Sequence, residues 1–282
     1  FNSSHEFGRK YGAGYQDNFG WKYDGASNLE ELFERVQPYF LRRLKSDVLE
    51  LPPKTFVNIP IELTNTQMKE YEKVEEGVIE QLTGEDNSGE KKTALEIILE
   101  LKRYVAGIKI KECMPIIKDM IEQGEKIVVF SEFQDTAEAV KAAFGDQAVM
   151  IHGGVNTESR DAAVQAFQDS SLDVMVFSGT IGAAGVGLTL TRSSNLLFIG
   201  SAWTPADMVP AEDRVHRAST TSSKVTIMTL YCENTVDEYV MNLLQEKAAI
   251  VNKAIDNTTG SRTVEKTDSL SQEVGNGSIV GA

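Results

Sequence analysis

The segment LDVMVFSGTIGAAGVGLTL, residues 172–190, gives the clearest indication of the fold. Its first eight residues are mostly apolar and predict a buried strand, and the other eleven form a loop that contains three glycines. Strands that are apolar throughout are typical of parallel sheets, which are buried on both faces. Four more runs of this kind occur in the chain: KIVVFS at 126–131, AVMIH at 148–152, NLLFIG at 195–200 and KVTIMTLY at 224–231.

Segments with helical spacing separate these strands. They cover residues 134–144, 156–167, 205–218 and 235–254. Alternating strands and helices predict an α/β fold in which helices cover both faces of a parallel sheet. Ligands of such sheets bind at the carboxyl ends of the strands, so we expect the loops that follow the strands to carry the site.

The N-terminal part of the chain has a different pattern. Residues 1–26 are rich in glycine and aromatics without a period, and they predict an irregular segment that packs through its rings. SNLE at 27–30 and TNTQ at 64–67 are capping-box patterns, and each predicts the start of a helix. A longer helix is expected over 94–123, so this region is a mostly helical extension.

TFVNIPIEL at 55–63 alternates and predicts an edge strand, because Pro60 cannot donate to a ladder. We expect three regions: an irregular and helical extension over 1–125, an α/β lobe over 126–256 and a disordered tail over 257–282. The tail is rich in serine, glycine, asparagine and threonine.

Composition limits the function classes. The chain of 282 residues has a net charge of −14, which argues against a broad nucleic-acid surface but allows a narrow groove of amides and a few cations. Two isolated cysteines and three histidines argue against a metal site and favour a reducing, intracellular compartment. The apolar runs are too short to span a bilayer, so we expect no membrane partner. Because the chain begins on Phe1, we also expect a fragment of a longer protein.

Two arginines stand out in WTPADMVPAEDRVHR, residues 203–217. Arg214 and Arg217 are three residues apart, which places them on one face if the segment is helical. Guanidinium groups are planar, forked donors that suit phosphate. The alternative is surface pairing, of Asp213 with Arg217 and of Glu212 with His216.

The loop TIGAAGVGLT at 180–189 can bring backbone amides close to an anion, or it can be a tight turn only. The phosphate-binding pattern GxxxxGK[ST] and a DExH-like acidic stretch are absent from the sequence. Nothing obvious in the chain therefore holds Mg²⁺ and the nucleotide phosphates.

Three further features allow two interpretations each. The turn His152–Gly153–Gly154 can present amides to a phosphodiester, or its histidine can be structural. Trp203 can be a core residue or a stacking platform. The basic run LRRLK at 41–45 can contact phosphate or form a solvated helix face.

Together these stretches resemble the second RecA-like lobe of Swi/Snf-type superfamily-two ATPases. The segment at 41–54, LRRLKSDVLELPPK, is similar to the one that precedes this lobe. KIVVFSEF at 126–133 resembles motif IV, AAGVGLTLT at 183–191 resembles motif V, and residues 203–217 resemble the W-x-P turn followed by motif VI. The motifs follow in the family's order over about residues 1–256.

The closest branch resembles the annealing-helicase or fork-remodelling type. The shared features are the opening FGRKY with GWKYDGASNLEEL, the GLTLT form of motif V and the residues that follow the second arginine. CENTVDEYVMNLLQEKAAIVNKAI at 232–255 is similar to the C-terminal helix that braces the lobe in that branch.

The resemblance implies roles for individual residues. Arg214 and Arg217 would reach the γ-phosphate of an ATP, with Mg²⁺, that is held mainly by a missing N-terminal lobe. Gly185 and Gly187 would lie near the same cleft. The resemblance implies contacts to the backbone of duplex or branched DNA from Ser131, His152, Gly153 and Thr180. This chain alone would then hydrolyse little ATP, and the whole protein would act in the cytoplasm, at a nucleoid or in a nucleus.

Two departures from the family leave an alternative open. Pro210 replaces a usual glutamine, at a position that we expect in the first turn of a helix, and Ala218–Ser219–Thr220 replaces Ile-Gly-Gln. The alternative is a degenerate lobe that binds DNA or a partner without hydrolysis. An ordinary nucleotide-binding α/β enzyme has less support, because no GxGxxG fingerprint follows the first strand.

Overall fold

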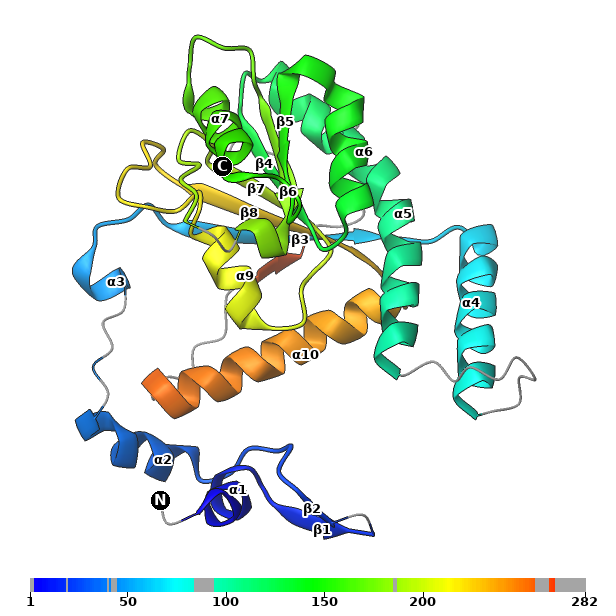
Figure 1. Ribbon diagram of the computed structural model, residues 1–282, viewed down its shortest axis with the longest axis vertical. Coiled ribbons are helices and arrows are strands. Elements are labelled where there is room, and N and C mark those ends of the chain that lie inside the picture. The colour runs from blue at the N-terminus through cyan, green and yellow to red at the C-terminus, as the bar shows by residue number, and fades with distance from the viewer. Residues whose placement is uncertain are drawn as a thin grey trace. The chain divides into compact units, whose positions relative to one another are not determined.

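The computed structural model describes residues 3–18, 20–39, 41, 45–83, 94–184, 187–256 and 264–266 (Figure 1). The chain forms two compact units. One unit combines Phe1–Leu49 with Leu243–Arg262, and the other combines Glu50–Asn242 with Thr263–Ala282. The second unit contains the predicted parallel sheet.

Seven strands form this sheet in the order β5-β6-β4-β7-β8-β3-β9, and all neighbouring strands run parallel. The predicted parallel sheet is confirmed. The four central strands β6, β4, β7 and β8 consist largely of buried residues, as their apolar runs predict. The strand bounds are β3 Lys54–Ile61, β4 Ile127–Ser131, β5 Ala148–Ile151, β6 Val176–Thr180, β7 Asn195–Ile199, β8 Val225–Cys232 and β9 Val264–Lys266.

Helices cover both faces of the sheet (Figure 1). On one face lie α5 (Ala94–Glu122) and α6 (Gln134–Phe144), and on the other lie α7 (Thr157–Gln168), α8 (Ile181–Ala184) and α9 (Pro205–Glu212). Alternate strand residues form the core beneath the second set, with side chains such as Phe130, Phe177 and Phe198 that are fully buried: relative exposure is 0% for each. The α/β architecture with two helical layers is therefore confirmed.

The predicted edge position of the strand at 55–63 is wrong. β3 lies between β8 and β9 and belongs to the same sheet as the strands beyond residue 126. Pro60 is tolerated there because β9 pairs only with residues 56–58 of β3. The missing amide hydrogen of Pro60 thus falls outside the ladder with β9.

Helix α4 (Asn65–Thr83) begins as its sequence predicts. The Thr64 Oγ1 atom accepts from the Gln67 backbone N–H at 3.3 Å, and the Gln67 side chain accepts from the Thr64 N–H at 2.9 Å. This reciprocal pair is a capping box. α5 then ends just before Gly124, as predicted.

The first unit holds more regular structure than its sequence pattern predicts. Helix α1 and a two-stranded antiparallel hairpin of β1 and β2 occupy the segment that we expected to be irregular. The bounds in and around this unit are α1 Ser4–Tyr11, β1 Tyr15–Asp17, β2 Gly20–Lys22, α2 Leu29–Val36, the 3₁₀ helix Gln37–Tyr39, α3 Lys45–Val48, α10 Val236–Val251 and the π-helix Asn252–Asp256.

Helix α2 exists, but its predicted capping box is wrong. Asn28 is the N-cap, at φ 51°, and no side chain caps the helix there. The Ser27 hydroxyl instead donates to the Lys10 carbonyl at 2.7 Å and accepts from the Ala13 N–H at 3.0 Å. The Ser27 hydroxyl therefore bonds to the end of α1 and does not cap α2.

Some predictions fall outside the described residues. These are most of the basic run at 41–45 and most of the predicted tail at 257–282, of which only β9 is described. Among the residues that are described, no helix is both long and apolar enough to cross a membrane.

Candidate functional site

The register of the sheet brings the carboxyl ends of four neighbouring strands to one edge. Ser131 at the end of β4 pairs with Thr180 at the end of β6 and with Ile199 at the end of β7. Ile151, the last residue of β5, pairs with Gly179. The structure therefore places the loops after β4, β5, β6 and β7 side by side, as the parallel sheet predicts.

One arginine side chain bonds to two carbonyl groups of the turn after β5. Arg160 of α7 donates from Nη2 to the His152 carbonyl at 3.1 Å and from Nε to the Val155 carbonyl at 3.0 Å. The His152 Nδ1 atom accepts from the Gly154 N–H at 3.1 Å. Gly153 and Gly154 remain exposed, so the turn presents backbone rather than side chain to solvent.

Ser131 and Thr180 lie next to each other but differ in exposure. Ser131 is buried, and its hydroxyl donates to the Phe133 carbonyl at 2.6 Å. Thr180 is half-buried and immediately precedes α8. Of these two hydroxyl groups, the one on Thr180 is nearer to solvent.

The glycine loop is tied to the segment that carries the arginines. Gly185 lies outside the described residues, whereas Gly187 is exposed and has a φ of +45°, a conformation that disfavours other residues. Beyond it, the Leu190 N–H donates to the Arg214 carbonyl at 2.9 Å. The Thr189 hydroxyl accepts from Arg217 Nη1 at 2.8 Å.

The two arginines do not lie on a helix, so the expectation of a shared helical face is wrong. α9 ends at Glu212, and the Arg214 N–H bonds to Ala211 in a tighter i−3 turn at 3.1 Å. The Arg214 carbonyl is bonded to the Leu190 N–H in the glycine loop, which stops it from continuing the helical ladder.

Pro210 is also misplaced by the sequence pattern. Pro205 occupies the start of α9, and Pro210 is inside the helix, in its second turn. A proline there removes one backbone hydrogen bond of the helix. The helix is short, and it ends two residues later.

The two guanidinium groups have different surroundings. Arg214 is 8% exposed and donates from Nη1 to the Leu188 carbonyl at 3.4 Å. Burial, and secondarily the charge of Arg217, lowers the pKa of Arg214. Arg217 is half-buried, and its Nε donates to the Asp213 carbonyl at 3.0 Å. Arg217 is the more accessible of the two cations.

Lys54 of β3 is a partner of the acidic residues beside the arginines. Its Nζ lies 3.1 Å from the Glu212 carboxylate and 3.5 Å from that of Asp213. The His216 Nε2 donates to the Pro52 carbonyl at 2.7 Å. The LPPK segment at 51–54 is thus attached directly to the arginine turn.

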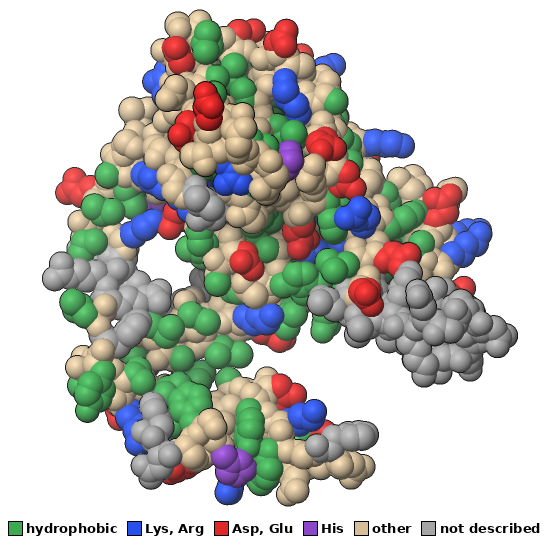
Figure 2. Space-filling model, viewed as in Figure 1, with side chains coloured by type: hydrophobic (Ala, Val, Ile, Leu, Met, Phe, Trp, Pro, Cys, Tyr) green, Lys and Arg blue, Asp and Glu red, His purple; other side chains and the backbone are tan. Residues whose placement is uncertain are grey.

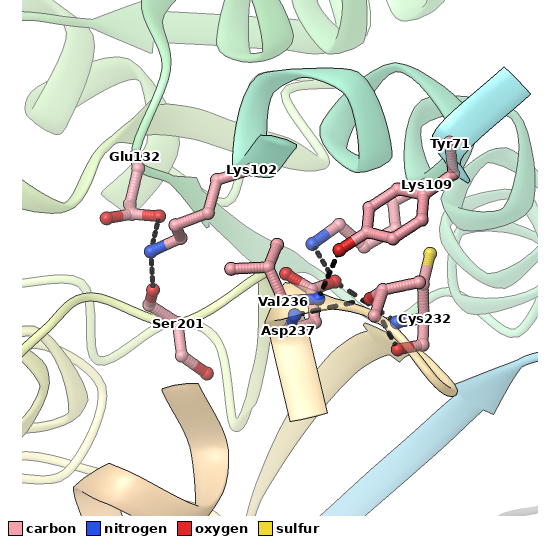
Figure 3. A network of polar contacts seen from close by, with 9 residues as sticks. Tyr71, Lys102, Lys109, Glu132, Ser201, Cys232, Val236 and Asp237 are labelled. Atoms are coloured by element: carbon pink, nitrogen blue, oxygen red, sulfur yellow. Dashed lines mark hydrogen bonds and ion pairs between the residues drawn. The ribbon is translucent and has the colours of Figure 1, made fainter. Parts of the chain in front are cut away.

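A buried network lies at the same edge of the sheet (Figure 3). Lys102 of α5 pairs with Glu132 after β4, donates to the Ser201 carbonyl at 2.7 Å, and lies 4.5 Å from the centroid of the Trp203 ring. Two turns further along α5, the Lys109 Nζ atom lies 2.5 Å from Asp237 Oδ2. Both lysines are 2% exposed.

Sequence reasoning missed four of these contributors: Lys54, Thr189, Arg160 and Lys102. Thr189 lies within the quoted glycine loop, and Lys54 ends the quoted LPPK segment, so both were visible as neighbours of the motifs. Arg160 and Lys102 carry no sequence signal beyond a charge on a helix. Among the described residues, no cluster of three or more His, Cys, Asp or Glu side chains could hold a metal ion.

The SNF2-related domain matches residues 1–108, and the helicase conserved C-terminal domain matches residues 108–219. The chain belongs to the SNF2-related family. The two matches adjoin at residue 108, inside α5.

Relatives within the SNF2-related family support the resemblance. The chain is 32% identical, over 95% of its length, to the SWI/SNF-related matrix-associated actin-dependent regulator of chromatin subfamily A-like protein 1 of Xenopus tropicalis. It is 32% identical, over 84% of its length, to the DNA annealing helicase and endonuclease ZRANB3 of Homo sapiens. The chain spans 29% and 22% of these two relatives, respectively.

Two solved structures of the family share the fold. The Sulfolobus solfataricus SWI2/SNF2 ATPase core in complex with dsDNA aligns with 83% of this chain and 53% of that chain, at a TM-score of 0.57 and 24% identity. The C-terminal part of the Fun30 ATPase domain aligns with 69% of this chain and 90% of that chain, at a TM-score of 0.56 and 18% identity. The RecA-like fold expected for this SNF2-related chain is confirmed.

Proposed function

We propose that this chain supplies the second lobe of a DNA-dependent ATPase that translocates on or remodels duplex or branched DNA. The observation that carries the proposal is the shared edge of the sheet. The exposed turn at 153–154 comes after β5, Thr180 ends β6, and the segment that leads through α9 to Arg217 begins after β7. The carboxyl ends of these strands and of β4 are in register. The name of the relative ZRANB3, a DNA annealing helicase and endonuclease, supports the DNA substrate and an annealing output.

The two arginines take different roles in this proposal. Arg217, the more exposed, contacts the phosphate on which charge develops during hydrolysis. Arg214 is a positioning residue, because its guanidinium contacts the Leu188 carbonyl and its own carbonyl holds Leu190. Gly187 gives the loop before Thr189 a left-handed backbone conformation that other residues disfavour.

The cofactor proposal follows the family. ATP with Mg²⁺ supplies the phosphoryl group, held mainly by a first lobe that carries the GxxxxGK[ST] pattern absent from this sequence. The half-buried Arg217 fits this arrangement, because its Nε and Nη1 are braced by Asp213 and Thr189 and its side chain stays partly open. Within the described part of the chain, no group of three or more His, Cys, Asp or Glu side chains could bind the metal.

The DNA contacts in this proposal use backbone amides and a hydroxyl group. The turn at His152–Gly153 presents backbone, and Thr180 adds a hydroxyl, so a net charge of −14 is compatible with binding. Ser131 holds the Phe133 carbonyl and shapes the loop after β4. Both cysteines are free and buried, which supports the proposal of a reducing compartment.

The test of this proposal is ATP hydrolysis by the protein that joins this chain to its phosphate-binding lobe, with and without duplex or forked DNA. Arg217→Ala should lower DNA-stimulated turnover by about 10³-fold or more, because arginine fingers contribute on that scale. Arg192→Ala, at an exposed arginine after the same loop, is the matched control and should keep turnover.

Two results would contradict the proposal. Near-normal turnover of Arg217→Ala would show that Arg217 does not contact the phosphate during hydrolysis. DNA binding without any turnover by the unmodified protein would instead favour the degenerate lobe, in which Pro210 inside α9 marks a lost coupling.

A further inference from the structure

Aromatic rings gather on the surface of the first unit. Trp21 and Tyr23 are each 39% exposed, and their rings are nearly parallel, at 9° with centroids 6.3 Å apart. The His5 ring meets Trp21 edge-on at 4.9 Å. Figure 2 shows hydrophobic, histidine and basic side chains side by side on the surface of this unit. Exposed aromatic rings of this kind can stack with the bases of a nucleic acid, which buried core rings cannot do.

A hollow lined by basic and acidic side chains adjoins these rings. It is lined by His5, Glu6, Arg9 and Lys10 of α1 and has a volume of about 360 Å³. The Arg9 guanidinium carbon lies 5.1 Å from the centroid of the Trp21 ring. His5 and Arg9 therefore belong both to the hollow and to the aromatic surface.

The aromatic surface is held in a fixed arrangement. A Cβ atom added at Gly8 would lie 2.6 Å from the Tyr23 ring, so the glycine is needed for this ring to pack on α1. The His5 Nδ1 atom also bonds with the Tyr23 hydroxyl. Rings that are already in place lose little conformational freedom when a ligand stacks on them.

We propose that α1 and the β1–β2 hairpin bind unpaired nucleotides of single-stranded DNA. A base stacks on the surface of Trp21 and Tyr23, and its phosphate lies in the hollow beside Arg9 and His5. Bases in a duplex stack on each other, so only an unpaired strand offers faces to the rings. The inference rests on the proposed function, since it names the DNA form that this unit of a DNA-acting protein takes.

Tryptophan fluorescence tests this site directly. The chain has two tryptophans, Trp21 and Trp203, so Trp203→Phe makes Trp21 the only reporter. We expect an oligothymidine of about 12 nucleotides to quench Trp21 emission, and a blunt duplex of the same length to quench it much less. Quenching by neither DNA, or equal quenching by both, would overturn the proposal.

Variants separate stacking from loss of the fold. Trp21→Ala should weaken oligothymidine binding, measured by anisotropy of a labelled strand, by about tenfold, while Trp21→Phe keeps most of it. Tyr239→Ala removes an aromatic ring that is 61% exposed on α10 and should leave affinity unchanged. Equal affinity for Trp21→Ala and the unmodified chain would contradict the site.

Arg9→Gln provides a second variant that does not remove a ring. It should lower the slope of log affinity against log salt by about 0.7, the value for one phosphate contact on a single strand. An unchanged slope would contradict the phosphate part of the site. Because no nucleotide hydrolysis enters these measurements, failure of the ATPase proposal with intact Trp21 quenching, or the reverse, distinguishes the two proposals.

Discussion

At the scale of single residues, the sheet unit buries two lysines that no sequence motif marks. Lys102 and Lys109 are each 2% exposed, and their partners Glu132 and Asp237 come from distant elements. Burial lowers the pKa of Lys102. The Asp237 carboxylate also accepts from the Cys232 N–H at 3.1 Å, so it links α5 to the end of β8.

Breaking this pair from one side should destabilise the sheet unit strongly. Lys109→Met leaves the Asp237 carboxylate buried without its cation, which costs about 3–5 kcal/mol in comparable pairs. Chemical denaturation would measure the loss. Lys111→Met, on the exposed face of the same helix, should change stability by less than about 0.5 kcal/mol.

The double variant Lys109→Met/Asp237→Asn tests the cause. It removes both charges and keeps an acceptor for the Cys232 N–H, so it should recover more than half of the lost stability. If the double variant is no more stable than Lys109→Met, the loss comes from packing rather than from the unpaired charge.

At the scale of secondary-structure elements, the two capping-box patterns had different outcomes. Thr64 and Gln67 cap α4 because both groups belong to the same turn, where each bonds to the backbone N–H of the other. Ser27 does not cap α2, because the end of α1 takes its hydroxyl. The same competition ends α9 early, where the glycine loop takes the Arg214 carbonyl.

The α4 cap gives a prediction at this scale. Thr64→Ala removes the acceptor for the Gln67 N–H and should lower the free energy of unfolding by about 1 kcal/mol. Thr64→Ser keeps the hydroxyl and should retain most of the stability. Ser27→Ala provides a contrast, since any loss there would reflect the contacts to Lys10 and Ala13. Equal stabilities of Thr64→Ala and Thr64→Ser would show that the hydroxyl does not cap α4.

At the scale of the whole molecule, the sheet unit encloses titratable groups that carry no charge at neutral pH. Burial raises the pKa of the Cys113 and Cys232 thiols to about 12, and that of Tyr71 to about 12. The Tyr71 hydroxyl accepts from the Val236 N–H at 2.9 Å, at the start of α10. These groups make the unit sensitive to alkali.

The sign of this effect follows from proton linkage. Between about pH 9 and pH 12 the unfolded chain releases thiol protons that the folded unit keeps, so the thiol contribution to stability is full below about pH 9 and falls as pH rises. We expect a loss on the order of 1–2 kcal/mol per thiol by about pH 10.5, measured by urea unfolding against about pH 8.

Comparison with Cys113→Ala isolates one thiol. The variant should lose less stability than the unmodified chain over the same pH interval, because Lys102 and all other titrating groups are common to both. Parallel pH profiles would show that the Cys113 thiol does not contribute.

Features that depend on neighbours along the chain could be predicted from the sequence alone. Fully apolar runs such as 126–131 and 195–200 specified buried parallel strands, because a strand with no polar face must be covered on both sides. The parallel direction in turn placed the loops that carry His152 and Thr180 at one edge. The motifs at 126–133, 183–191 and 203–217 identified the family correctly.

Features that depend on contacts between distant segments became visible only in the folded chain. β3 joined the sheet beside β8, although alternation and Pro60 suggested an edge strand, because pairing depends on the partner strand and not on β3 alone. The end of α9, the different exposures of Arg214 and Arg217, and the burial of Lys102 and Lys109 have the same origin. Each results from hydrogen bonds or ion pairs to residues that are distant in the sequence. These contacts form only when folding brings the partners together, so a local sequence pattern does not predict them.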